Sequence, residues 1–100
     1  MEVRVGPLDD IAEGGVKIVQ AGSLFLGIYR IEGRVYALED RCSHDDGPLC
    51  EGEREGYEVI CPRHGARFDL RSGAVLSLPA TENVDAFEVV MRDGEAFVVT

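Results

Sequence analysis

Every cysteine and histidine of this chain lies within 23 consecutive positions. Cys42 and His44 are separated by one residue, Cys61 and His64 by two, and 16 residues lie between the two pairs. Two short pairs on two loops can present four ligands to one site. Thiolate and imidazole ligands suit a zinc ion in a closed tetrahedral site. They equally suit a [2Fe-2S] cluster, with two cysteines on one iron and two histidines on the other.

The spacing of the four residues favours the cluster. Zinc modules more often use two cysteines separated by two residues, or two histidines separated by three to five. Here each pair contains one sulfur and one nitrogen, so each loop can give one ligand to each iron. A zinc-stabilised interaction module remains the alternative, and it would be colourless and without an EPR signal after reduction.

The rest of the chain is predicted to be all-β and to form one domain of 100 residues. Short apolar-alternating runs predict strands at 2–6, 16–20, 24–31, 34–38, 86–91 and 95–100, and no long stretch has a helical repeat. Glu32-Gly33 and Asp93-Gly94 predict tight hairpin turns. Residues 7–15 could hold one helical turn or none. Residues 40–82 contain eight glycines or prolines, so burial alone would hardly stabilise this loop-rich segment.

The two pairs resemble the motif of the Rieske family, in which C-x-H is followed by C-x2-H. Pro62 after the second cysteine and Gly65 after the second histidine agree with that motif. The resemblance extends over the whole chain and implies an antiparallel β-sandwich base (1–39 and 83–100) carrying a cluster-binding subdomain (40–82). It implies one Rieske-type [2Fe-2S] cluster, with these ligands: Cys42 and Cys61 on the inner iron, His44 and His64 on the outer iron.

Further residues are expected to shape the cluster environment. Gly47 and Gly65 would let backbone amides approach the sulfides. Residues 77–80 resemble the family's third loop, so Pro79 is expected to cover the cluster and, with Leu49 and Phe68, to exclude water.

The resemblance also places the chain among the low-potential members. High-potential members have a disulfide between the two loops, and Gly47 and Arg63 occupy those positions here. They also place hydroxyl donors where this chain has Ala66 and Phe68. We therefore expect a reduction potential at the low end of the Rieske range, on the order of −150 mV.

The remaining residues near the motif have ordinary interpretations. Cys50 is expected to be a packed, unreactive thiol, although a reserve ligand or a redox sensor is possible. Asp45 and Asp46 are expected to be solvated loop residues, with a lowering of the potential as the second interpretation. Arg63 would contact a partner or be solvated. Four aromatic residues of the predicted strands are expected in the hydrophobic core: Phe25, Tyr29, Phe87 and Phe97.

A small electron carrier is the function that this combination predicts. Both histidines are committed to the cluster, so no mononuclear iron site can form and the chain is not expected to be an enzyme. It resembles ferredoxin components that pass electrons from an NAD(P)H-dependent flavin reductase to a terminal oxygenase. The alternative is a non-catalytic subunit similar to the small subunit of nitrite reductases, or an accessory protein of iron-sulfur cluster assembly.

Charge and hydropathy limit the kinds of partner and the location to be expected. The formal net charge of −9 disfavours nucleic acid and anionic membranes and favours a basic protein partner. No apolar run is long enough to cross a bilayer, and no secretory signal is evident. We therefore expect a cytoplasmic protein, and a monomer by analogy with other small carriers.

Overall fold

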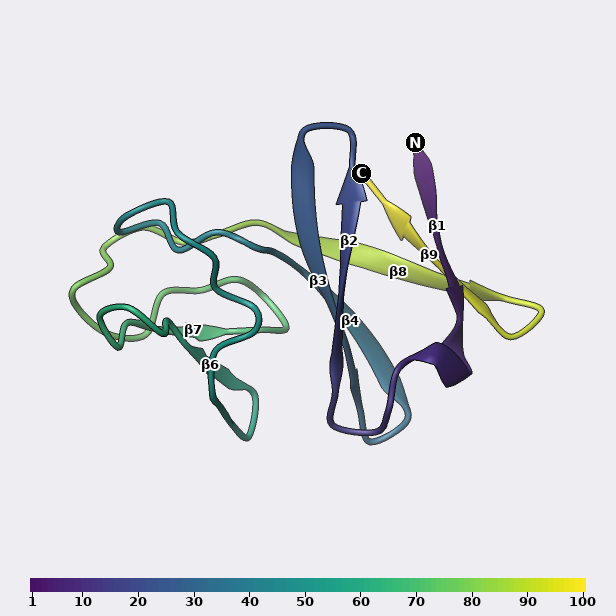
Figure 1. Cartoon of the computed structure of the whole chain (residues 1–100), viewed down its shortest axis with the longest axis horizontal. Coiled ribbons are helices and arrows are strands. Elements are labelled where there is room, and N and C mark those ends of the chain that lie inside the picture. The colour runs from purple at the N-terminus through teal and green to yellow at the C-terminus, as the bar shows by residue number, and fades with distance from the viewer.

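Two lobes lie side by side in the structure, a computed structural model that describes residues 1–100 (Figure 1). The larger lobe is a six-stranded antiparallel sheet in the order β1-β9-β8-β4-β3-β2. Its strands are β1 (Glu2–Pro7), β2 (Val16–Ala21), β3 (Leu24–Ile31), β4 (Arg34–Glu39), β8 (Ala86–Arg92) and β9 (Glu95–Val99). The smaller lobe contains β5 (Arg54–Glu55), β6 (Glu58–Ile60) and β7 (Arg67–Asp69) between long loops. The all-β prediction is therefore confirmed.

Both predicted hairpin turns are present. Glu32 and Gly33 have φ of 52° and 76°, and Asp93 and Gly94 have φ of 53° and 77°. Two successive positive φ values are the signature of the turn that best matches strand twist in a two-residue hairpin. The segment after β1 forms a single 3-10 turn, η1 (Leu8–Asp10). No helix in the structure has the length and apolar character needed to traverse a bilayer.

The large sheet bends until its two ends enclose a core. Val5 on β1 and Val98 on β9 pack in the same buried cluster as Leu26 and Ile28 on β3 and Ala37 on β4. The termini meet at the same end of this lobe, where the N-terminal ammonium donates a hydrogen bond of 3.0 Å to the carbonyl oxygen of Thr100 (Figure 1).

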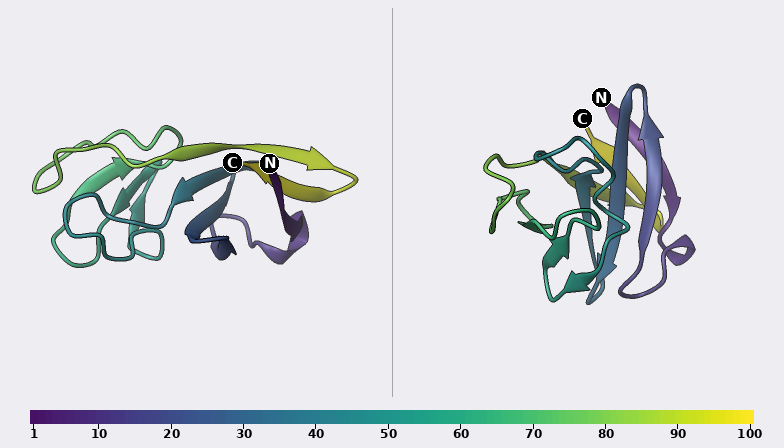
Figure 2. Two further views of the ribbon diagram at one scale, coloured as in Figure 1. Left: turned by 90° about the horizontal axis from the view of Figure 1, so that it is seen from above. Right: turned by 60° about the vertical axis from the view of Figure 1, so that its left-hand side comes forward.

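β3 also joins the two lobes, because its opposite face packs on the smaller one. Side chains alternate across a strand, so Leu26 and Ile28 face the first core while Tyr29 and Ile31 enter a second core. That second core includes Leu49, Phe68 and Leu70 of the smaller lobe and both Cys42 and Cys61. Figure 2 shows the smaller lobe adjoining the sheet, with the two connections between the lobes running alongside each other.

Two of the four aromatic residues expected in the core lie outside it. Tyr29 is buried and Phe87 packs on the first core, as predicted. Phe25 is 51% exposed because it lies at the start of β3, before the residues that contact the smaller lobe. Phe97 alternates with the buried Ala96 and Val98, so it faces outward, where the guanidinium of Arg92 covers its ring at 4.6 Å.

Candidate metal centre

The two loops that carry the cysteines and histidines have the same backbone design. The amide of Cys42 donates to the carbonyl of Gly47 at 2.8 Å, and the amide of Cys61 donates to the carbonyl of Ala66 at 2.8 Å. In the opposite direction, the residue four positions after each cysteine donates to that cysteine's carbonyl. We call residues 42–47 the first loop and residues 61–66 the second loop.

In each loop the fifth residue has a positive φ, in the left-handed region of backbone conformation. Gly65 has φ of 77° in the second loop, and Asp46 has φ of 61° in the first. Glycine adopts such a φ without strain, and aspartate is among the few other residues that visit it routinely. Gly65 thus has a conformational role. Gly47 is not at the left-handed position.

The four predicted ligands come together as two neighbouring pairs. Cys42 and Cys61 are 0% and 1% exposed, and their sulfur atoms lie within 4.8 Å of each other and of a carboxylate oxygen of Asp45. His44 and His64 are exposed, with ring centroids 5.2 Å apart and ring planes at 90°. The thiols therefore lie inside the smaller lobe, and the imidazoles lie at its surface.

The buried thiol of Cys42 keeps its proton more tightly than an exposed one until a metal binds. Burial raises the pKa of Cys42 above its ordinary value, and the adjacent Cys61 thiol raises it further. A cation bound between the two sulfurs would displace the thiol protons, because a thiol that coordinates a metal is deprotonated. Two thiolates below two accessible imidazoles provide the donor set of a [2Fe-2S] centre with mixed ligation, so the residues present fit that group.

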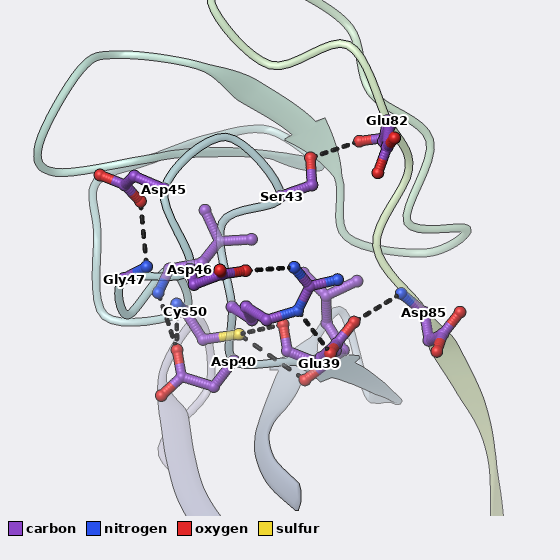
Figure 3. A network of polar contacts seen from close by, with 12 residues as sticks. Glu39, Asp40, Ser43, Asp45, Asp46, Gly47, Cys50, Glu82 and Asp85 are labelled. Carbon is purple, nitrogen blue, oxygen red and sulfur yellow. Dashed lines mark hydrogen bonds and ion pairs between the residues drawn. The ribbon is translucent and has the colours of Figure 1, made fainter.

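Polar contacts attach the first loop to the end of β4 (Figure 3). Glu39 accepts hydrogen bonds from the guanidinium of Arg41 at 2.9 Å and from the amide of Asp85 at 3.2 Å. Arg41 also donates to Asp46 Oδ1 at 2.6 Å. One carboxylate therefore fixes the chain entering the smaller lobe, the chain leaving it and, through Arg41, the first loop.

A second carboxylate holds the segment after the first loop. Asp40 Oδ1 accepts hydrogen bonds from the amides of Leu49 and Cys50, at 2.9 and 2.8 Å (Figure 3). Cys50 itself is buried, and its sulfur lies 3.7 Å from the carbonyl oxygen of Leu38 and 3.6 Å from that of Glu39. Burial raises the pKa of the Cys50 thiol to about 12. Cys50 is thus packed in the core, as the sequence predicted, and its burial favours the protonated thiol.

The predicted third loop (77–80) contacts β7, which follows the second loop, and the chain just after it contacts the first loop. Ser43 Oγ donates to the carbonyl oxygen of Glu82 at 2.5 Å (Figure 3), and Ser77 Oγ accepts from the amide of Arg67 at 3.0 Å. Pro79 is half-buried on this loop and follows a cis peptide bond from Leu78. Leu49 and Phe68, the other predicted shielding residues, are fully buried.

Asp45 is the residue whose place the sequence did not predict. It is only 17% exposed instead of solvated, and the amide of Gly47 donates to its Oδ1 at 3.0 Å. That hydrogen bond, reinforced by the nearby charge of Arg63, holds the pKa of the Asp45 carboxyl below its ordinary value despite partial burial. The available signal was the presence of opposite charges directly beside ligands, Asp45 after His44 and Arg63 before His64.

The amides of both predicted glycines have acceptors within the protein. Gly47 donates to Asp45, and Gly65 donates to the carbonyl of Cys61 at 3.0 Å. The contribution of these glycines that is visible in the structure is to the shape of the loops. A Cβ atom at Gly47 would lie 3.1 Å from Arg63 Cδ, which is a tight contact.

Comparison with known proteins agrees with this geometry. Residues 1–88 match the family described as the Rieske [2Fe-2S] domain. The ferredoxin component of a naphthalene 1,2-dioxygenase system from Pseudomonas putida is 38% identical over 86 residues, covering 86% of this chain and 83% of that protein. The ferredoxin subunit of a 3-phenylpropionate/cinnamic acid dioxygenase from Photorhabdus laumondii is 33% identical, covering 97% and 92%.

Solved structures give the same result. The ferredoxin of carbazole 1,9a-dioxygenase from Nocardioides aromaticivorans superimposes with a TM-score of 0.92 at 33% identity, covering 98% of this chain and 96% of that one. A complex of reduced oxygenase and oxidised ferredoxin in carbazole 1,9a-dioxygenase contains a chain that matches with a TM-score of 0.90 at 34% identity, covering 97% and 91%. The chain therefore belongs to the Rieske [2Fe-2S] domain family.

Proposed function

We propose that this chain is a cytoplasmic one-electron carrier that passes electrons from an NAD(P)H-dependent flavin reductase to a terminal oxygenase. In this proposal Cys42 and Cys61 bind one iron of the [2Fe-2S] cluster, and His44 and His64 bind the other. Residues 40–82 form the cluster-binding subdomain on a basal part made of residues 1–39 and 83–100.

The contrast between two buried and two exposed ligand side chains carries the proposal. When bound, the cluster accepts and returns one electron. Two buried thiols hold its inner side away from water, while two exposed imidazoles bring its outer side to the surface. An electron then has a short path to a partner docked over the imidazoles. Gly65 shapes the second loop, Gly47 leaves space in the first, and Pro79 belongs to the covering third loop.

The small number of histidines in the chain fits electron transfer without substrate chemistry. An oxygenase needs a separate mononuclear iron site, commonly two histidines and a carboxylate, and this chain has only two histidines in all. The similar proteins are named as ferredoxin components, and one similar solved structure is a complex of ferredoxin with oxygenase. We therefore assign the chain a carrier role and no catalytic role.

The surface charge suits transient encounters with basic partners. The formal net charge is −9, and Glu51, Glu53 and Glu82 near the loops take part in no ion pair. Opposite charges on a partner would accelerate association and make it sensitive to salt. A monomer would leave the imidazole face free for each partner in turn.

Two measurements test the proposed function. Metal and acid-labile sulfide analysis of freshly purified protein should give two irons and two sulfides per chain, with an EPR signal that appears on reduction by dithionite. The same protein should be reduced by NAD(P)H only when a ferredoxin reductase is added. One zinc per chain without sulfide would contradict the cluster, and failure to exchange electrons with any ferredoxin reductase would contradict the carrier role.

A further inference from the structure

The two loops are joined by side chains and not by their backbones. The backbone hydrogen bonds of each loop close within that loop, and all three cysteines are free thiols. Since the proposed ligands are divided equally between the loops, holding a cluster requires the loops to keep a fixed separation. The contact that could fix it lies between Arg63 and Asp45.

Arg63 reaches from the second loop across the first. Its Nε lies 3.3 Å from Asp45 Oδ2, and its Cδ and Nη1 lie 3.1 Å from the position that a Cβ of Gly47 would occupy. The absence of a side chain at position 47 is what allows the arginine to lie there. Asp45 is held from its other side by the Gly47 amide on Oδ1.

Asp45 Oδ2 is shielded from water and accepts no well-formed hydrogen bond, although the other oxygen does. Its polar neighbours are Arg63 Nε and, at 3.5 Å, Nε2 of His64. A buried carboxylate is costly unless a cation compensates it. A carboxylate that contacts the outer nitrogen of a metal-binding histidine also orients that ring and leaves its other nitrogen for the metal.

We propose that Arg63 and Asp45 form an ionic link between the two loops that retains the cluster, and that their charges shift its reduction potential in opposite directions. The inference rests on the proposed ligand set. One-electron reduction adds one negative charge to the centre. The Asp45 carboxylate disfavours that added charge and the Arg63 guanidinium favours it.

The test uses single-charge variants and two readouts on the holoprotein. Arg63→Gln and Asp45→Asn should each increase the rate of cluster loss to a chelator by about two- to fivefold, the range for breaking a partly exposed ion pair. Arg63→Gln should lower the reduction potential, whereas Asp45→Asn should raise it. A purely structural role would not give shifts of opposite sign.

Three further variants test whether these effects are specific to the ion pair between Arg63 and Asp45. Arg71→Gln is the matched control, because it removes the same charge from an ion pair with Asp69 in the same lobe, and it should change neither readout appreciably. Arg63→Lys keeps the charge and should restore the potential. Gly47→Ala should displace the guanidinium and reproduce the faster cluster loss of Arg63→Gln in milder form.

Two results would overturn the link: potentials that shift in the same direction in Arg63→Gln and Asp45→Asn, or cluster loss in Arg63→Gln no faster than in Arg71→Gln. A wild-type protein without iron and sulfide would overturn the proposed function instead. The ionic link would then still be measurable as the coupling between Asp45→Asn and Arg63→Gln in urea unfolding of the protein, and additive effects there would refute it.

Discussion

The hydroxyl of Tyr29, on β3, donates a hydrogen bond of 2.9 Å to the carbonyl oxygen of Cys50. The bond crosses the boundary between the two lobes and is buried. Two residues before Tyr29, on the same face of the strand, a Cβ at Gly27 would lie 2.4 Å from Cys50 Cβ. Two residues of β3 therefore hold the segment after the first loop against the large sheet. Tyr29 donates a hydrogen bond to it, and the missing side chain of Gly27 leaves room for Cys50.

Replacing Tyr29 with phenylalanine should destabilise the protein measurably. The variant leaves the buried Cys50 carbonyl without this donor, at a cost of about 1–3 kcal/mol in the free energy of unfolding. In a domain of this size each kcal/mol corresponds to about 4–8 °C in Tm. Differential scanning calorimetry measures the change. Tyr57→Phe is the control, because the Tyr57 hydroxyl makes only an exposed contact of 3.5 Å with Glu32; an equal loss in both variants would contradict the argument.

A side chain at position 27 should also destabilise the protein. In Gly27→Ala the new methyl group would overlap the side chain of Cys50, and overpacking of a core typically costs about 1–3 kcal/mol or more. The clash predicts non-additivity, so Gly27→Ala combined with Cys50→Gly should lose less stability than the sum of the two single variants. Urea unfolding of the four proteins measures this cycle. Additive losses would show that the two residues do not compete for the same space.

Much of this arrangement could be predicted from the sequence, because its signals are local. Glu32-Gly33 and Asp93-Gly94 predict their turns through backbone conformation, and cysteine and histidine spacing predicts the donor set. The position of Asp45 could not be predicted in this way. Whether a charged loop residue is solvated or buried depends on the partner that the fold brings to it, here Arg63, 18 positions away along the chain. The same limit applies to Phe25, whose exposure depends on where the smaller lobe ends.

The free energy of unfolding should fall as the pH rises above about 9. Burial raises the pKa of Cys50 from 9.0 to about 12, so between these values the unfolded thiol has lost its proton and the native thiol has kept it. The unfolded state then binds fewer protons and is favoured as the pH rises. Burial also raises the pKa of Tyr29, which acts in the same direction at higher pH.

Cys50→Ser isolates the cysteine contribution, because serine does not ionise in this range. Unfolding by urea at several pH values between 8 and 10.5 should show a shallower decline in the variant than in the wild type. Effects of pH on the cluster are common to both proteins and cancel in the comparison. The variant should also keep its colour and potential. Parallel curves, or a colourless variant, would contradict the assignment of Cys50 as a packed thiol.

The reduction potential should lie near the low end of the Rieske range, at about −150 mV. Ala66 and Phe68 are fully buried and offer no side-chain hydroxyl to the site, so the reduced state lacks the hydrogen bonds that would stabilise it. Ala66→Ser should raise the potential by tens of millivolts, since about 59 mV corresponds to a tenfold change for a one-electron couple. Protein-film voltammetry measures the reduction potential of each protein. Ala37→Ser, equally buried but in the first core, should leave the potential unchanged, and a wild-type value well above zero would refute the prediction.

Exchanging His64 for cysteine should change the electronic character of the centre without changing the number of ligands. Three thiolates and one imidazole carry more negative charge than two of each, so adding an electron becomes less favourable and the potential should move toward the value of about −400 mV typical of plant-type ferredoxins. The visible absorption and EPR spectra should also shift toward those of plant-type ferredoxins. The thiolate would also face Asp45 in place of the imidazole that lies 3.5 Å from it, so slower cluster assembly is expected. A variant that keeps the wild-type spectrum and potential would show that His64 is not a ligand, and the division of ligands between the two loops would then have to be redrawn.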